Sequence, residues 1–140
     1  MSVSFNKFNQ FIEDMAKKVH NLGADALTIA LVNSPAPVNT NTVLANLTPI
    51  AYTYCSARVP TITSCTQTAG LLKLILADLI LTASGGDVGP FRYIVLYNDT
   101  PTSPADALIG WYDYGSSITL HDTETLMLDF DGSAGVIQNQ

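Results

Sequence analysis

The sequence predicts a mainly β protein: an antiparallel, jelly-roll-like β-sandwich of about eight strands, preceded by one N-terminal amphipathic helix. Short apolar or alternating segments follow each other at intervals of about 8–12 residues, separated by turn-forming residues. Beyond the N-terminal segment, the chain shows no regular alternation of strands with crossover helices, which a parallel sheet would require. Charged residues make up only 13% of the chain, and 15 Thr and 9 Asn residues supply much of its polar surface.

The chain is predicted to form one domain, residues 1–140, with the helix within 1–23 and the sandwich in 24–140. At 140 residues, roughly two-thirds of the surface of the unfolded chain is buried on folding, so the core needs no disulfide or metal ion to stabilise it. Hydrophobic residues make up 47% of the chain, which excludes intrinsic disorder. No linker or internal repeat divides the sequence.

The N-terminal helix is predicted from apolar residues that recur every three or four positions. These residues are Phe5, Phe8, Ile12, Met15, Val19 and Leu22. Ser4 is the expected N-cap, and Gly23 is expected to end the helix. The apolar face either packs on the sheet of its own domain or docks on a neighbouring subunit.

The strands are predicted from short apolar or alternating segments bounded by turn residues. The predicted strands are 27–32, 59–66, 71–82, 91–97, 108–114, 118–120 and 126–131, with a mixed region at 43–54. The segment 71–82 is leucine-rich and also suits a helix, but its position between two turns favours a strand. Proline-containing loops are predicted at 33–42 and 98–107, and tighter turns at 67–70 and 85–90.

The acidic charge is unevenly distributed along the chain. Residues 1–92 carry six basic and five acidic side chains, whereas residues 93–140 carry seven acidic and no basic ones. The acidic segment forms either solvated loops or a face that meets a basic partner. A nucleic-acid partner is not expected, because the chain has too few positive charges to replace phosphate counterions.

A membrane partner is not expected either. The longest apolar stretch, 71–81, is interrupted by Lys73 and Asp78, and a spanning helix needs about 20 apolar residues. No signal peptide is visible at the N-terminus. We therefore expect synthesis in a cytoplasm.

Candidate catalytic residues are few, so we expect no enzyme and no cofactor. The two histidines, His20 and His121, both read as surface residues, and neither sits in a recognisable triad pattern. Asp129 and Asp131 share one face of the last predicted strand, about 7 Å apart, a spacing that a carboxylate pair could use. Asp129 to Gly132 resembles part of a calcium loop, but the later ligands are missing.

Cys55 and Cys65 lie ten residues apart, which matches neither a metal site nor a redox pair. They form either two unreactive reduced thiols or a disulfide across a loop. No metal site is predicted from them.

Five aromatic residues fall on two neighbouring predicted strands: Tyr93, Tyr97, Trp111, Tyr112 and Tyr114. Such a group is most often cross-strand packing within a sheet core. It can also form a stacking platform for a sugar ligand or part of a subunit interface.

Three segments resemble a family of small virion proteins of tailed bacteriophages. They are residues 5–23, which open with FNKF and close with KVHNLG, residues 89–99 (GPFRYIVLYND) and residues 108–117 (LIGWYDYGSS). The resemblance implies a virion structural protein, of which the capsid decoration or cement protein is the nearest role. It implies the major capsid protein as partner, a homo-oligomer such as a dimer or trimer, and a place on the capsid exterior. The cysteines lie outside the resembling pattern.

The implied role assigns partner-binding residues to the helix, the proline-containing loops and the aromatic group. They are Phe5, Phe8, Ile12, Pro35, Pro37, Pro101, Pro104 and Trp111. Proline pre-stiffens a loop and so lowers the ordering cost of binding. The alternative role is a tail, neck or baseplate component, including a β-sandwich module that binds host glycans through Trp111.

Overall fold

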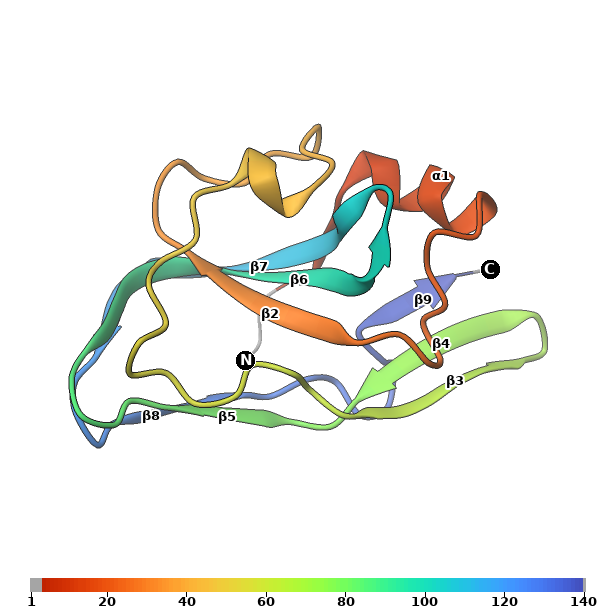
Figure 1. Ribbon diagram of the computed structural model, residues 1–140. Coiled ribbons are helices and arrows are strands. Elements are labelled where there is room, and N and C mark those ends of the chain that lie inside the picture. The colour runs from red at the N-terminus through yellow and green to blue at the C-terminus, as the bar shows by residue number, and fades with distance from the viewer. Residues whose placement is uncertain (1–3, 140) are drawn as a thin grey trace.

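The structure, a computed structural model that describes residues 4–139, has two layers of antiparallel strands and one helix (Figure 1). One layer is a four-stranded sheet in the order β1 (Asn6–Lys7), β7 (Ala105–Leu120), β6 (Val88–Thr102), β2 (Leu27–Val32). The other layer contains β3 (Ile62–Thr68), β4 (Leu71–Leu76) and β9 (Ile137–Asn139) in one sheet, and β5 (Leu79–Thr82) with β8 (Thr125–Leu128) in another. This confirms the predicted fold class. Residues 1–3 and 140 of the predicted domain lie outside the described residues.

The core consists of two clusters of buried hydrophobic residues. The larger lies between the two layers and includes Ile29, Leu31, Ile94, Leu74 and Leu81. The smaller lies on the outer face of the four-stranded sheet and is covered by the segment 33–50, which includes the short 3-10 helix η1 (Leu44–Asn46) (Figure 1). Because both faces of β2 are covered, all six of its residues are buried, which explains its continuous apolar sequence.

The helix α1 (Asn9–Ala16) is shorter than predicted. Asn6 and Lys7 instead pair with the edge of β7, so Phe5 lies before the helix, and Phe8 rather than Ser4 is its N-cap. The buried face was also predicted wrongly: Phe11 is buried, and Ile12 is 66% exposed. Helical spacing located the helix but not its orientation, because β1 fixes the angle at which α1 meets the sheet.

The leucine-rich segment 71–82 forms strands, as expected, but two of them in different sheets. β4 ends at Leu76 and β5 begins at Leu79, and the carboxylate of Asp78 between them accepts a hydrogen bond from the backbone of Phe130. The region 43–54 holds η1 and isolated bridges but no strand.

The loop predicted at 98–107 is instead the end of a long hairpin. β6 and β7 remain paired from Asn98 opposite Ala107 to Thr102 opposite Ala105, so only residues 103 and 104 turn. The register shifts between Asn98 and Thr102, and this irregularity accommodates Pro101, which cannot donate a ladder hydrogen bond. Likewise, the separately predicted strands 108–114 and 118–120 are both part of β7.

Candidate functional site

Three of the predicted partner-binding residues, Phe5, Ile12 and Trp111, line two hollows beside α1. Phe5 and Trp111 line a hollow of about 530 Å³, and Ile12 borders a small cavity of about 80 Å³. Lys7 lines both, so the two are neighbours on one surface. Val38, half exposed in the covering loop, completes the wall of the larger hollow. We call the surface formed by Phe5, Lys7, Ile12, Val38 and Trp111 the α1 face.

The edge strand β1 sets the geometry of the α1 face. Asn6 lies opposite Trp111 and Lys7 opposite Gly110. Successive side chains of a strand point to opposite faces, so Phe5 packs on Tyr112, with ring centroids 5.0 Å apart, and Phe8 on Trp111, at 4.6 Å. Phe8 is therefore the buried support of Trp111 and not a contact residue as predicted.

Gly110 permits this arrangement. A Cβ atom at this position would lie 2.6 Å from the backbone oxygen of Asn6 and closer still to the ring of Phe5. Sequence reasoning missed Gly110, Lys7 and Val38. The available signal for Val38 was its position, an apolar residue directly after Pro37 within the predicted loop 33–42.

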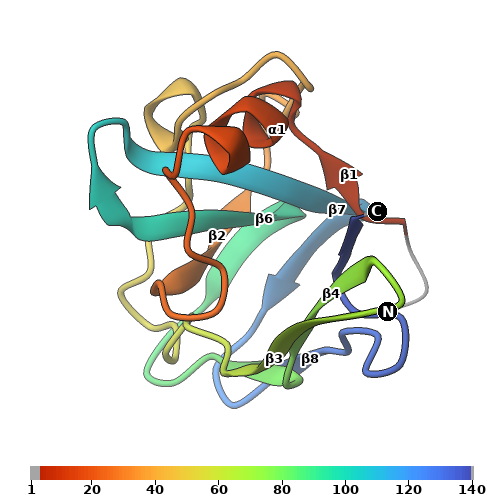
Figure 2. The ribbon, with the colours of Figure 1, turned by 90° about the vertical axis from the view of Figure 1, so that its right-hand side faces the viewer.

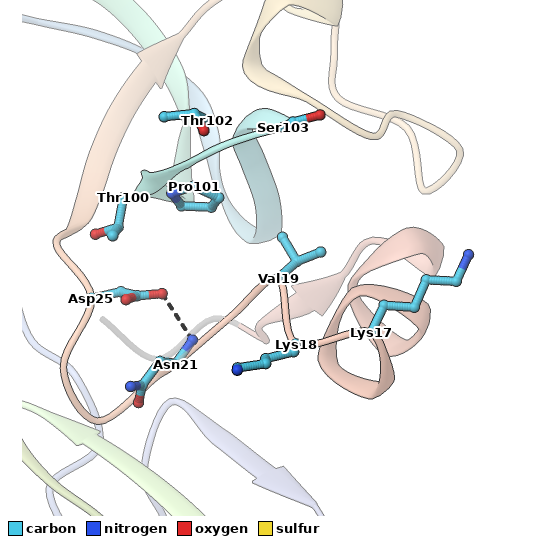
Figure 3. A pocket seen from close by; sticks show the side chains of 9 residues that line it. All are labelled: Lys17, Lys18, Val19, Asn21, Asp25, Thr100, Pro101, Thr102 and Ser103. Carbon is cyan, nitrogen blue, oxygen red and sulfur yellow. Dashed lines mark hydrogen bonds between the residues drawn. The ribbon is translucent and has the colours of Figure 1, made fainter.

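The four predicted prolines divide between two places. Pro35 is exposed and Pro37 is buried, both in the loop that covers the sheet. Pro101 lines a second hollow, of about 410 Å³, between the tip of the β6–β7 hairpin and the chain that leaves α1 (Figure 3). Pro104 is half-buried at the hairpin tip but does not line it. The prolines therefore do not form one site.

The hairpin-tip hollow is lined mainly by polar side chains. Its lining residues are Lys17, Lys18, Val19, Asn21, Asp25, Thr100, Pro101, Thr102 and Ser103 (Figure 3). The carboxylate of Asp25 accepts a hydrogen bond of 2.8 Å from the backbone of Asn21 and thereby holds one wall of the hollow.

Behind this hollow lies a buried polar network. Asn98 donates to Asp25 at 2.6 Å and lies 3.1 Å from Nδ1 of His20. Because an amide nitrogen only donates, Nδ1 accepts and the neutral ring carries its proton on Nε2, which lies 4.0 Å from a carboxylate oxygen of Asp14. His20 is only 6% exposed, so its predicted surface position was wrong. Burial lowers the pKa of His20.

The predicted chemistry candidates are not gathered into a reactive centre. His121, which is exposed as predicted, lies 3.2 Å from Asp87. Asp131 accepts hydrogen bonds from the backbones of Ala134 and Ser133, and these bonds lower the pKa of its carboxyl group. Residues 4–139 contain no group of three metal-ligating side chains.

Both cysteines are free and half-buried, which decides between the two alternatives predicted for them. Burial raises the pKa of the Cys55 and Cys65 thiols. Neither is therefore an activated nucleophile at neutral pH.

The aromatic group is mostly core. Tyr93, Tyr97 and Tyr112 are buried, whereas Tyr114 is exposed and Trp111 is half-buried. Trp111 lines a hollow together with the polar side chains of Asn6 and Asn39. A stacking platform in this hollow would use Trp111.

Comparison of the chain with protein-family models, curated proteins and solved structures gave no match. Among the described residues, no helix has the length and apolar character to cross a membrane.

Proposed function

We propose that this protein is a structural component of a bacteriophage virion, acting as a capsid decoration protein that binds the shell of major capsid protein and stabilises it. The observation that carries the proposal is the α1 face. There, Ile12 and Val38 expose apolar side chains around a hollow whose wall includes Phe5 and Trp111. Exposed apolar groups beside a hollow on a rigid sheet suit contact with another protein surface.

A decoration protein has to contact the shell and, as an oligomer, its own neighbours. The α1 face and the hairpin-tip hollow are two separate surfaces that could serve these contacts. Modest contacts are sufficient for such a role, because a shell repeats each of them many times. The resemblance of three sequence segments to phage virion proteins supplies the biological setting.

The first test is the copy number of the protein in purified virus particles, measured by quantitative mass spectrometry against the major capsid protein. Hundreds of copies per particle would support a shell component. About six or twelve copies would indicate a neck, tail or baseplate component, since these positions follow closed ring symmetries. Absence from the particles would overturn the virion proposal.

The second test is function on the shell. Particles stripped of the protein are expected to lose integrity at a lower temperature than intact ones, and added purified protein is expected to restore it. Equal thermal stability of stripped and intact particles would contradict a stabilising role.

A host-glycan-binding module is the second candidate, and one observation favours it. The indole of Trp111 lines a hollow together with Asn6 and Asn39, whose amides can hydrogen-bond sugar hydroxyl groups. In this case Trp111→Ala abolishes binding on a glycan array, whereas Tyr114→Ala, a control on the same strand, leaves binding intact. No binding by the wild type, or equal binding by both variants, would exclude this candidate.

A further inference from the structure

The net charge of the protein is concentrated in two segments of the sequence. Segments 77–88 and 121–131 contain six acidic residues and neither lysine nor arginine. The remaining sequence contains six acidic and six basic residues, which cancel, so these two segments account for the whole net charge of −6. All six carboxylates are exposed: Asp78, Asp87, Asp122, Glu124, Asp129 and Asp131.

Two exposed apolar side chains lie among these carboxylates. Ile80 of β5 and Met127 of β8 are directly opposite each other in the two-stranded sheet, 56% and 51% exposed. Their neighbours Leu81 and Leu128 are buried in the core, so Ile80 and Met127 point outward. We call Ile80, Met127 and the carboxylates of Asp78, Asp87, Asp122, Glu124 and Asp129 the acidic face. Asp131 is not part of it, because it lies near Lys73 and Tyr112.

The α1 face has the opposite charge. The exposed charged residues on or next to it are Lys7, Lys17, Lys18 and Glu13, and Lys17 is paired with Glu13. The nearby Asp14 is buried. The α1 face thus combines exposed apolar side chains, Ile12 and Val38, with an excess of positive charge.

The elements that carry the two faces, α1 and the β5–β8 sheet, lie on opposite sides of the molecule (Figure 1). In Figures 1 and 2, α1 lies outside one layer of the sandwich, whereas β5 and β8 lie in the other layer. One copy can therefore use both faces at once, for two different neighbours.

We infer that copies of this chain associate head to tail, with the α1 face of one copy seated on the acidic face of the next. The inference rests on the proposed role of the α1 face as a protein-binding surface and names its partner. Each face offers two exposed apolar side chains, and the surrounding charges are opposite in sign. Two acidic faces brought together would instead oppose five carboxylates with five, which disfavours a symmetric contact between them.

This geometry has a structural consequence. A contact between two different faces of identical chains repeats from copy to copy, so it closes into a ring or continues as a filament. The hairpin-tip hollow borders the α1 face, because Lys17 and Lys18 line it.

Two single substitutions separate the faces. Ile12→Glu places a carboxylate in the α1 face, and Met127→Lys places an ammonium group in the acidic face. Both side chains are more than half exposed, so both variants are expected to fold, which circular dichroism checks. Thr68→Lys is the control, because Thr68 is exposed at the end of β3 and belongs to neither face.

Sedimentation velocity of the purified chains tests the inference. Wild type and Thr68→Lys are expected to form larger species as concentration rises and to dissociate in high salt. Ile12→Glu and Met127→Lys are each expected to weaken association about tenfold or more and to sediment as monomers. An equimolar mixture of the two is expected to form a one-to-one dimer, since each variant keeps the face that the other has lost.

Three outcomes overturn the inference: a monomeric wild type at every concentration, single variants that still assemble, or a mixture that stays monomeric. Particle binding separates this failure from failure of the proposed function. A monomeric wild type that rebinds stripped particles overturns the head-to-tail contact and leaves the decoration role standing. A protein that self-associates but is absent from virus particles overturns the decoration role and leaves the head-to-tail contact standing.

Discussion

Replacing Gly110 with alanine should detach the edge strand that builds the α1 face. The new Cβ atom would lie 2.6 Å from the backbone oxygen of Asn6, well inside van der Waals contact. The Phe5 ring, which is also too close, can rotate away, but the Asn6 oxygen belongs to the backbone of β1. Relief therefore requires β1 to move away from β7.

The expected cost follows from overpacking a tight contact, about 1–3 kcal/mol. An unfolding entropy of about 2.1 cal/mol/K per residue gives about 0.3 kcal/mol/K for 140 residues. The melting temperature should therefore fall by about 3–10 °C.

Two measurements check this prediction. Thermal unfolding gives the stability change, and hydrogen exchange should show faster exchange at Phe8, whose amide donates to the Ile109 carbonyl at 3.1 Å. Gly132→Ala is the matched control: nothing lies within 4 Å of its would-be Cβ atom, and its φ is not in the left-handed region. Unchanged stability and unchanged exchange at Phe8 in Gly110→Ala would refute the reasoning.

Three further predictions concern the core, the buried histidine and the thiols. Phe8→Ala removes a fully buried ring beneath Trp111 and should lower the free energy of unfolding, measured in urea, by about 3–5 kcal/mol. The fluorescence of Trp111, the single tryptophan, should shift as well. A loss below about 1 kcal/mol would contradict the role of Phe8 in the core. Because burial lowers the pKa of His20 below its ordinary 6.5, the unfolded chain binds the proton more tightly, so stability is highest above pH 6.5 and falls as pH drops toward the folded-state pKa. The test is urea unfolding of the wild type and His20→Gln between about pH 5 and pH 8. An equal dependence of the unfolding free energy on pH in both proteins would rule out His20 as the cause. Because burial raises the pKa of both thiols, Cys55 and Cys65 should react with iodoacetamide more slowly than a free cysteine at pH 7, and faster reaction would contradict it.

The predicted and observed elements differ most where distant parts of the chain meet. Period-2 and apolar patterns located β2, the aromatic strand within β6 and the strand character of 71–82, because these patterns reflect which faces are buried. The same patterns predicted a loop at 98–107. They carry no information on the pairing of Asn98 with Ala107 or on the register shift that accommodates Pro101.

The candidate site shows the same division. Phe5, Ile12 and Trp111 were predicted to bind a partner, which stays a prediction, and the structure places all three on the α1 face. The sequence also predicted contact by Phe8, which is buried, because helical spacing takes no account of a strand that starts before the helix.

By itself, the sequence determined the fold class, the acidic balance and the positions of most strands, since composition and local periodicity reflect burial and turn chemistry. Only the tertiary structure decided which side of α1 faces the core, how Asp14, His20, Asn98 and Asp25 come together, and that two acidic segments about 40 residues apart form a single face. The physical reason is that strand pairing joins residues far apart in the chain, and its register is set by packing across the whole molecule rather than by neighbouring residues.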